Sequence, residues 1–181
     1  WVSTLTIPLS ALLLFTFGST VLHRVRRAGS DDRAAIVGIA AMAMLFGTIS
    51  AAFAVDAVLI ARVDLLSDEL VLVLNDISTA LFVFNWATLA VALWALGLAA
   101  RSTGLIGGRM RMLTVIGAVG LAIGSTQIAA ALDGVLMGLL FGLAGFACWL
   151  TFLVVVGIRL VRPGRDRPSV EVDDLGVSPP V

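Results

Sequence analysis

The sequence contains no lysine, and only one cysteine and one histidine. The single cysteine, Cys148, excludes an intrachain disulfide and a cysteine-bound metal cluster. The single histidine, His23, excludes a haem held between paired histidines and also a His-rich metal site. No cofactor is therefore expected.

Charged residues are also scarce. They make up 13% of the chain, whereas 60% is apolar and the mean hydropathy is +1.08. A soluble globular domain needs a charged surface, so this composition excludes one and predicts a membrane protein. The formal net charge is zero, and no basic surface is large enough to suggest nucleic acid as a partner.

Catalytic motifs are missing as well. The sequence has no Ser/His/Asp, HExxH, Walker or GxGxxG pattern. Cys148 has no histidine on a facing span, and His23 lies among arginines. A membrane-embedded enzyme acting on lipid is therefore disfavoured.

Long apolar stretches are what the chain has in quantity. A helix needs about 20 apolar residues to cross the roughly 30 Å of hydrocarbon, and backbone groups inside a bilayer must be bonded within the helix. The sequence thus predicts an all-α polytopic bundle over residues 1–162. Its five spans are expected at Leu5–Leu22, Ala34–Ala61, Leu70–Ala100, Leu113–Leu132 and Val135–Ile158.

The arginines predict the orientation of this bundle. All but Arg62 fall in three clusters, within residues 24–33, 101–111 and 159–167. Because basic residues flanking spans stay on the cytoplasmic side, the carboxyl terminus is expected in the cytoplasm of a multi-pass cell-membrane protein. Residues 163–181 are polar and proline-containing, which predicts a disordered cytoplasmic tail. The start at Trp1 suggests a lost upstream helix, which would make six spans.

Glycines predict close packing between the fourth and fifth spans. Only residues 133–134 join these spans, so we expect a tight antiparallel hairpin. Each span carries a GxxxG pair, Gly120 with Gly124 and Gly138 with Gly142. Gly124 and Gly142 each lie nine residues from Asp133, so both are expected at nearly the same depth. Such small residues let two backbones approach closely, and packing within the chain is favoured over a dimer contact.

A few polar residues inside the spans invite a functional hypothesis, because ionisable groups are costly at membrane depth. Asp56, Asp76 and Gln127 each lie about 9 to 10 Å from the outer end of a helix, by the rise per residue. They predict a polar pocket below the outer face, with Asn75 at its rim, that could hold a cation, a proton or an amine. The alternative is that each residue reaches water, caps its helix or bonds a nearby backbone.

Asn85 lies nine residues beyond Asp76, which turns it to the opposite helix face at about mid-membrane. There it is expected to make an interhelical hydrogen bond worth about 1 kcal/mol.

Part of the chain, from Leu74 to Arg162, resembles a known group. The similarity is carried by Asn75-Asp76-Ile-Ser-Thr-Ala-Leu-Phe82, by Ala-Leu-Trp94-Ala-Leu-Gly-Leu-Ala-Ala-Arg101-Ser-Thr-Gly104, and by the glycine-rich hairpin that ends in Ile158-Arg159-Leu-Val-Arg162. These segments are similar to uncharacterised actinobacterial multi-pass membrane proteins of the domain-of-unknown-function 4386 family. The resemblance implies a bundle of membrane helices without established chemistry, with Asp76 as a possible shared site.

Two functions remain open at this point. The first is a structural or regulatory membrane component that contacts the lipid bilayer and a membrane-protein partner or a second copy of itself. The alternative is a small transporter or an ion- or ligand-binding protein that uses the predicted polar pocket. An internal repeat would favour a transporter, but no convincing repeat is found.

Overall fold

The structure is a computed structural model, and it describes residues 2–127 and 137–161. Every regular element in these two ranges is helical, which confirms the predicted all-helical fold. The elements are α1 (Val2–Arg27), α2 (Arg33–Arg62), the short 3₁₀ helix η1 (Val63–Leu65), α3 (Asp68–Ser102), α4 (Gly108–Ser125) and α6 (Met137–Val161).

Four of these helices are long and apolar enough to cross a membrane. They are α1 from Pro8, α2 together with η1, α3, and α6 from Leu139. The remaining helix, α4, overlaps the predicted span Leu113–Leu132 but begins earlier, at Gly108. The end of that predicted span, the turn at 133–134 and the tail at 163–181 lie outside the described residues.

The start of α3 has a local cause in the sequence. The side chain of Ser67 accepts a hydrogen bond from the backbone N of Leu70 at 3.4 Å and so caps the helix. Asp68 and Glu69 follow in the first turn, where their negative charges interact favourably with the positive end of the helix dipole. The helix therefore begins slightly before the apolar stretch predicted from Leu70.

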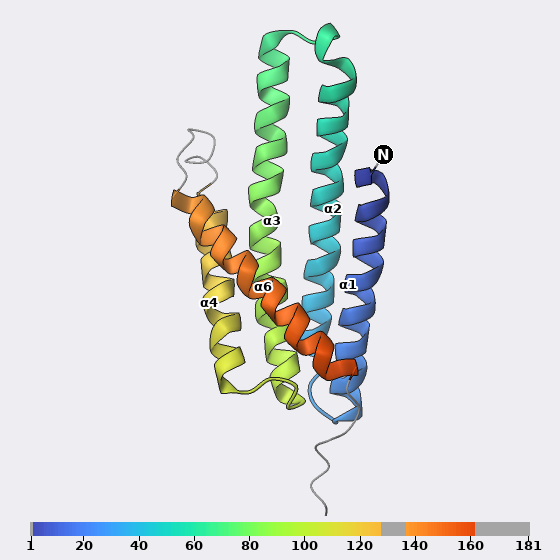
Figure 1. The fold of residues 1–181 in the computed structure, drawn as a ribbon, viewed down its shortest axis with the longest axis vertical. Coiled ribbons are helices and arrows are strands. Elements are labelled where there is room, and N and C mark those ends of the chain that lie inside the picture. The colour runs from blue at the N-terminus through green and yellow to red at the C-terminus, as the bar shows by residue number, and fades with distance from the viewer. Residues whose placement is uncertain (1, 128–136, 162–181) are drawn as a thin grey trace, which may run out of the picture.

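The arginines gather at one end of the bundle. α1, α3 and α6 end there with arginines in or near their last turns, while α2 and α4 begin there; in Figure 1 this is the lower end. Arg159 Nη1 donates a hydrogen bond to the backbone oxygen of Leu105 at 2.7 Å, which ties α6 to the α3–α4 connection. Arg26 Nε pairs with Asp32 Oδ2 at 2.9 Å within the α1–α2 connection. We call this the arginine end.

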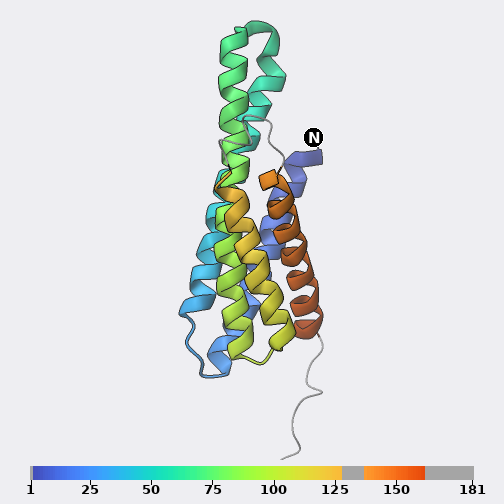
Figure 2. The ribbon, with the colours of Figure 1, turned by 90° about the vertical axis from the view of Figure 1, so that its left-hand side faces the viewer.

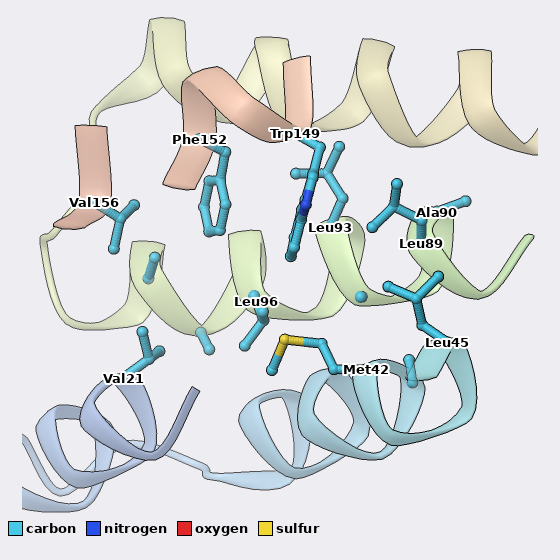
Figure 3. Packing of buried hydrophobic residues seen from close by; sticks show 14 of the residues in the cluster. Val21, Met42, Leu45, Leu89, Ala90, Leu93, Leu96, Trp149, Phe152 and Val156 are labelled. Atoms are coloured by element: carbon cyan, nitrogen blue, oxygen red, sulfur yellow. The ribbon is translucent and has the colours of Figure 1, made fainter. Parts of the chain in front are cut away.

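The centre of the fold is α3, which contacts α1, α2, α4 and α6. Its buried side chains belong almost entirely to the half nearer the arginine end, from Val83 onward. Figure 3 shows side chains of four helices meeting there, with Leu93 and Leu96 of α3 between Met42 of α2 and Phe152 of α6. These four side chains are fully buried.

The α2–α3 hairpin is longer than the rest of the bundle. Figures 1 and 2 both show it continuing past the first residues of α1 and past the neighbouring ends of α4 and α6. We call residues 57–74 the arm. Most of its apolar side chains are exposed, at 82% for Ile60, 74% for Leu65 and 64% for Leu72, and no helix outside the hairpin covers these in the described part of the chain.

Glycines line the contact between α4 and α6. A Cβ on Gly124 would lie 2.9 Å from Gly142 Cα and 2.6 Å from Cε3 of Trp86. These two glycines therefore face each other, as their equal distance from the predicted turn suggested. Gly120 lies against the backbone of α6, where a Cβ would be 3.1 Å from the Phe141 oxygen. The surroundings of Gly138 lie outside the described side chains.

Two further glycines, Gly117 and Gly145, extend this contact toward the arginine end. A Cβ on Gly145 would lie 2.7 Å from the Gly117 backbone oxygen. The close approach of α4 and α6 thus involves more positions than the two GxxxG pairs of the sequence.

Candidate functional site

A groove of about 370 Å³ lies between α2 and α3, next to the arm. Its lining combines two phenylalanines and an isoleucine with small and polar residues. The lining residues are Ile49, Ala52, Phe53 and Asp56 of α2, and Asn75, Ser78, Thr79, Phe82 and Asn85 of α3.

Helical spacing explains why the polar residues face this groove. In α2, Thr48, Ala52 and Asp56 follow each other at intervals of four residues. In α3, Ser78 and Asn85 are seven residues apart, which is about two turns. Both spacings return to the same helix face. Ala52 and Ser78 are small and buried, at 6% and 9% exposure, so space remains between the helices.

Among the described residues, Asp56 makes one side-chain hydrogen bond. Ser78 Oγ donates a hydrogen bond to Asp56 Oδ1 at 2.6 Å, and Asp56 is half-buried. Hydrogen bonds to a carboxylate are short and stronger than neutral ones. A carboxylate has about four acceptor positions on its two oxygens, so this bond leaves most of them for water or a ligand.

No basic side chain neutralises this carboxylate within the described ranges. The ion pairs found there are Arg26 with Asp32 and Arg33 with Asp31, all at the arginine end. The groove lining contains no arginine or histidine, and Asp56 is its only charged residue. Asp56 is therefore the one acid of the groove, and no base among the described residues pairs with it.

Asn85 lines the other end of the groove and is 3% exposed. Its Oδ1 is hydrogen-bonded to Thr48 Oγ1 of α2, so Asn85 makes an interhelical bond. Its Nδ2 is buried and has no partner among the described residues. A buried polar group without a partner costs about 1–3 kcal/mol.

The orientation of the Asn85 amide does not remove this deficit. Thr48 Oγ1 also lies 3.0 Å from the Met44 oxygen and 3.1 Å from the Leu45 oxygen, and a hydroxyl has one hydrogen to donate. If that hydrogen goes to a backbone oxygen, the amide must turn so that its nitrogen donates to Thr48. The amide oxygen then takes the place without a partner. In either orientation, one polar atom of Asn85 remains unpaired.

The structure brings only part of the predicted polar pocket together. Asp56 and Asn75 both line the groove, whereas Asp76 and Gln127 do not. Asn75 and Asp76 are both exposed, but the side chain of Asp76 is turned about 100° around α3 from that of Asn75, which lines the groove. Gln127 follows α4, which packs against α3 and α6 rather than against the arm. Residues at equal depth thus lie on different sides of α3.

The sequence argument did not assign three polar lining residues to the predicted pocket, namely Ser78, Thr79 and Asn85. It also missed Thr48, which is hydrogen-bonded to Asn85. The available signal was the spacing, because Thr48 and Asp56 are eight residues apart in α2, and Ser78 and Asn85 are seven residues apart in α3.

The side chains that line the groove are suited to binding a small molecule through hydrogen bonds and apolar contacts. Its lining holds no cysteine or histidine, and no group of three or more metal-ligating side chains occurs in the described part of the chain. Its polar lining groups are one carboxyl, two amides and two hydroxyls, and the rest of the lining is apolar.

No protein-family model, no curated protein and no solved structure matches this chain. The resemblance to the domain-of-unknown-function 4386 family therefore stays a prediction.

Proposed function

We propose that this protein is an integral protein of the cell membrane, with its arginine end in the cytoplasm, that binds a small molecule in the groove between α2 and α3. The membrane part is supported by the four long apolar helices and by the many exposed large apolar side chains on them. The orientation is supported by the gathering of arginines at one end.

Distances along the helices support a position for the groove. Asp56 lies 23 residues from Arg33, and Ser78 lies 23 residues from Arg101. Each spacing corresponds to about 34 Å, slightly more than the roughly 30 Å of hydrocarbon. Asn85 is about 24 Å from Arg101 by the same rise. In a membrane, the groove would run from the outer interface into the outer third of the hydrocarbon.

The observation that carries the ligand-binding proposal is the unpaired polar atom of Asn85. It is costly in any protein interior, and more so where lipid rather than water surrounds the helices. A ligand in the groove can supply the missing hydrogen bond. The volume of the groove and its apolar walls are typical of small-molecule sites.

A second candidate function has a separate observation in its favour. The exposed apolar residues of the arm would suit a structural or regulatory component that packs against a membrane-protein partner or a second copy. In that case Asn85 would serve only to hold α2 against α3.

The substitution Asn85→Leu separates the two candidates. Leucine removes the unpaired polar atom, and Thr48 keeps its backbone acceptors. If the amide serves a ligand, the ligand-free protein in phosphatidylcholine nanodiscs should unfold at a higher temperature. If it serves packing, the loss of the Thr48 bond should lower the unfolding temperature and overturn the ligand-binding proposal. Asn75→Leu, at an exposed lining residue, is the matched control.

The proposed orientation has its own test. In a Cys148→Ala background, the variant Asp64→Cys should react in intact cells with a thiol reagent that cannot cross membranes. The variant Gly107→Cys, at a position where a Cβ meets nothing within 4 Å, should react only after the cells are permeabilised. The reverse pattern would contradict the orientation.

A further inference from the structure

We infer that the ligand of this groove is a small organic cation that also carries a hydroxyl group at its far end. This inference rests on the proposed function, because it names the class of molecule that the same groove takes. It is drawn from the two polar ends of the groove and from the apolar wall between them.

The end near the arm selects a positive charge. Asp56 has free acceptor positions beside its bond to Ser78, and no basic residue lines the groove. At the edge of the hydrocarbon, water screens this carboxylate less than it would in bulk solution. An ammonium group would supply both the opposite charge and hydrogen-bond donors.

The aromatic lining favours an organic cation over an inorganic ion. Phe53 and Phe82 line the groove and keep 45% and 56% of their surface exposed. Ring faces attract alkylammonium groups through their quadrupole. Asp56 is the only acid among the lining residues, so it would leave a divalent metal ion without full charge compensation, and a metal ion alone would not fill about 370 Å³. An organic molecule can fill that space.

The end of the groove at Asn85 favours a neutral polar group. Asn85 lies two turns along α3 from Ser78, which places its amide about 10 Å from the carboxylate along the helix axis. A hydroxyl both donates and accepts, so it satisfies the unpaired atom in either orientation of the amide. Between the two ends lie Ile49, Ala52 and Phe82, which suit an apolar spacer.

A matched set of simple probes tests this assignment. Aminohexanol has an ammonium group, an apolar chain of suitable reach and a terminal hydroxyl. Hexylamine lacks the hydroxyl, hexanol lacks the charge, and hydroxyhexanoate reverses the charge. Binding of each probe to the full chain in phosphatidylcholine nanodiscs would be measured by calorimetric titration, with the thermal unfolding shift as a second readout.

We expect saturable binding of aminohexanol, with affinity at least about tenfold higher than that of hexylamine or hexanol, the usual effect of one charged or buried hydrogen bond. Hydroxyhexanoate should not bind. The variant Asp56→Asn should weaken aminohexanol binding and leave hexanol unaffected. It keeps an acceptor for Ser78, so it should fold. Asp76→Asn, at the neighbouring exposed acid outside the groove, should change nothing.

The outcomes separate the ligand class from the groove itself. If hexanol or hydroxyhexanoate binds as tightly as aminohexanol, or if Na⁺ displaces aminohexanol, the organic-cation class is wrong while the groove still binds ligands. If no probe binds in the wild-type protein, the ligand class is wrong. If Asn85→Leu also lowers the unfolding temperature of the ligand-free protein, both the ligand class and the proposal that the groove binds a small molecule are wrong.

Discussion

Ser78 of α3 donates its hydroxyl hydrogen to Asp56 of α2 across 2.6 Å, next to the arm. Figures 1 and 2 show that the described parts of α1, α4 and α6 do not flank the arm. The bond therefore joins α2 and α3 beside a stretch of the hairpin against which no other described helix packs.

The variant Ser78→Ala should lower the free energy of unfolding by about 1 kcal/mol. Asp56 loses its donor, but it is only half-buried and can gain water in the groove. Reversible unfolding in mixed detergent micelles would measure the change. Thr79→Ala, at the next lining residue, should have little effect, and equal losses for both variants would contradict a specific role for the Ser78 bond.

Gly142→Ala should destabilise the protein by about 1–3 kcal/mol, the usual cost of overpacking. A Cβ at this position would overlap the ring of Trp86, which packs between α4 and α6. Gly157→Ala in the same helix is the matched control, because a Cβ there meets nothing within 4 Å. Thermal unfolding of the two variants should differ clearly, and a neutral Gly142→Ala would show that the α4–α6 contact is looser than described.

Leu93→Ala should cost about 2–5 kcal/mol, because it opens a cavity among side chains that no other residue can fill. Leu93 is fully buried in the cluster of Figure 3. Leu98 on the same helix is 41% exposed, so Leu98→Ala should cost far less. If both variants lost a similar free energy of unfolding in the same assay, Leu93 would not lie in the core.

Arg159→Gln should loosen the connection between α3 and α4. It removes the charged donor that holds the Leu105 oxygen at 2.7 Å. Amide hydrogen exchange at residues 104–108 should become faster, while exchange in the centre of α3 stays unchanged. Arg111→Gln, at an arginine for which no side-chain hydrogen bond is found in the described ranges, is the control, and similar acceleration in both variants would point to a general charge effect.

The sequence was sufficient to predict that the described part of the chain is helical and which helix ends lie together, whereas only four of the five predicted spans correspond to helices long and apolar enough to cross a membrane. Apolar length and arginine position are properties of each helix alone, so they can be read without knowing the neighbours. The facing of Gly124 and Gly142 followed from the same reasoning, since both are nine residues from the predicted turn.

What the sequence argument could not supply was rotation about each helix axis. Asp76 and Gln127 were placed at the depth of Asp56, but depth does not say which neighbour a side chain faces. Ser78 and Asn85 lie on one face of α3 because of their spacing in the sequence. Their hydrogen bonds to Asp56 and Thr48 depend on how α2 packs against that face. That packing is a tertiary property.

The contact between Phe82 and Trp86 connects the groove to the remaining helices. Phe82 lines the groove, its ring centre lies 6.3 Å from that of Trp86 in an edge-on arrangement, and the indole rests on Gly124 and Gly142. Any molecule that displaces the Phe82 ring must change the surroundings of this buried indole. With the other tryptophans replaced, Trp86 would serve as a built-in fluorescent sensor, whose emission wavelength reports occupancy of the groove without a label.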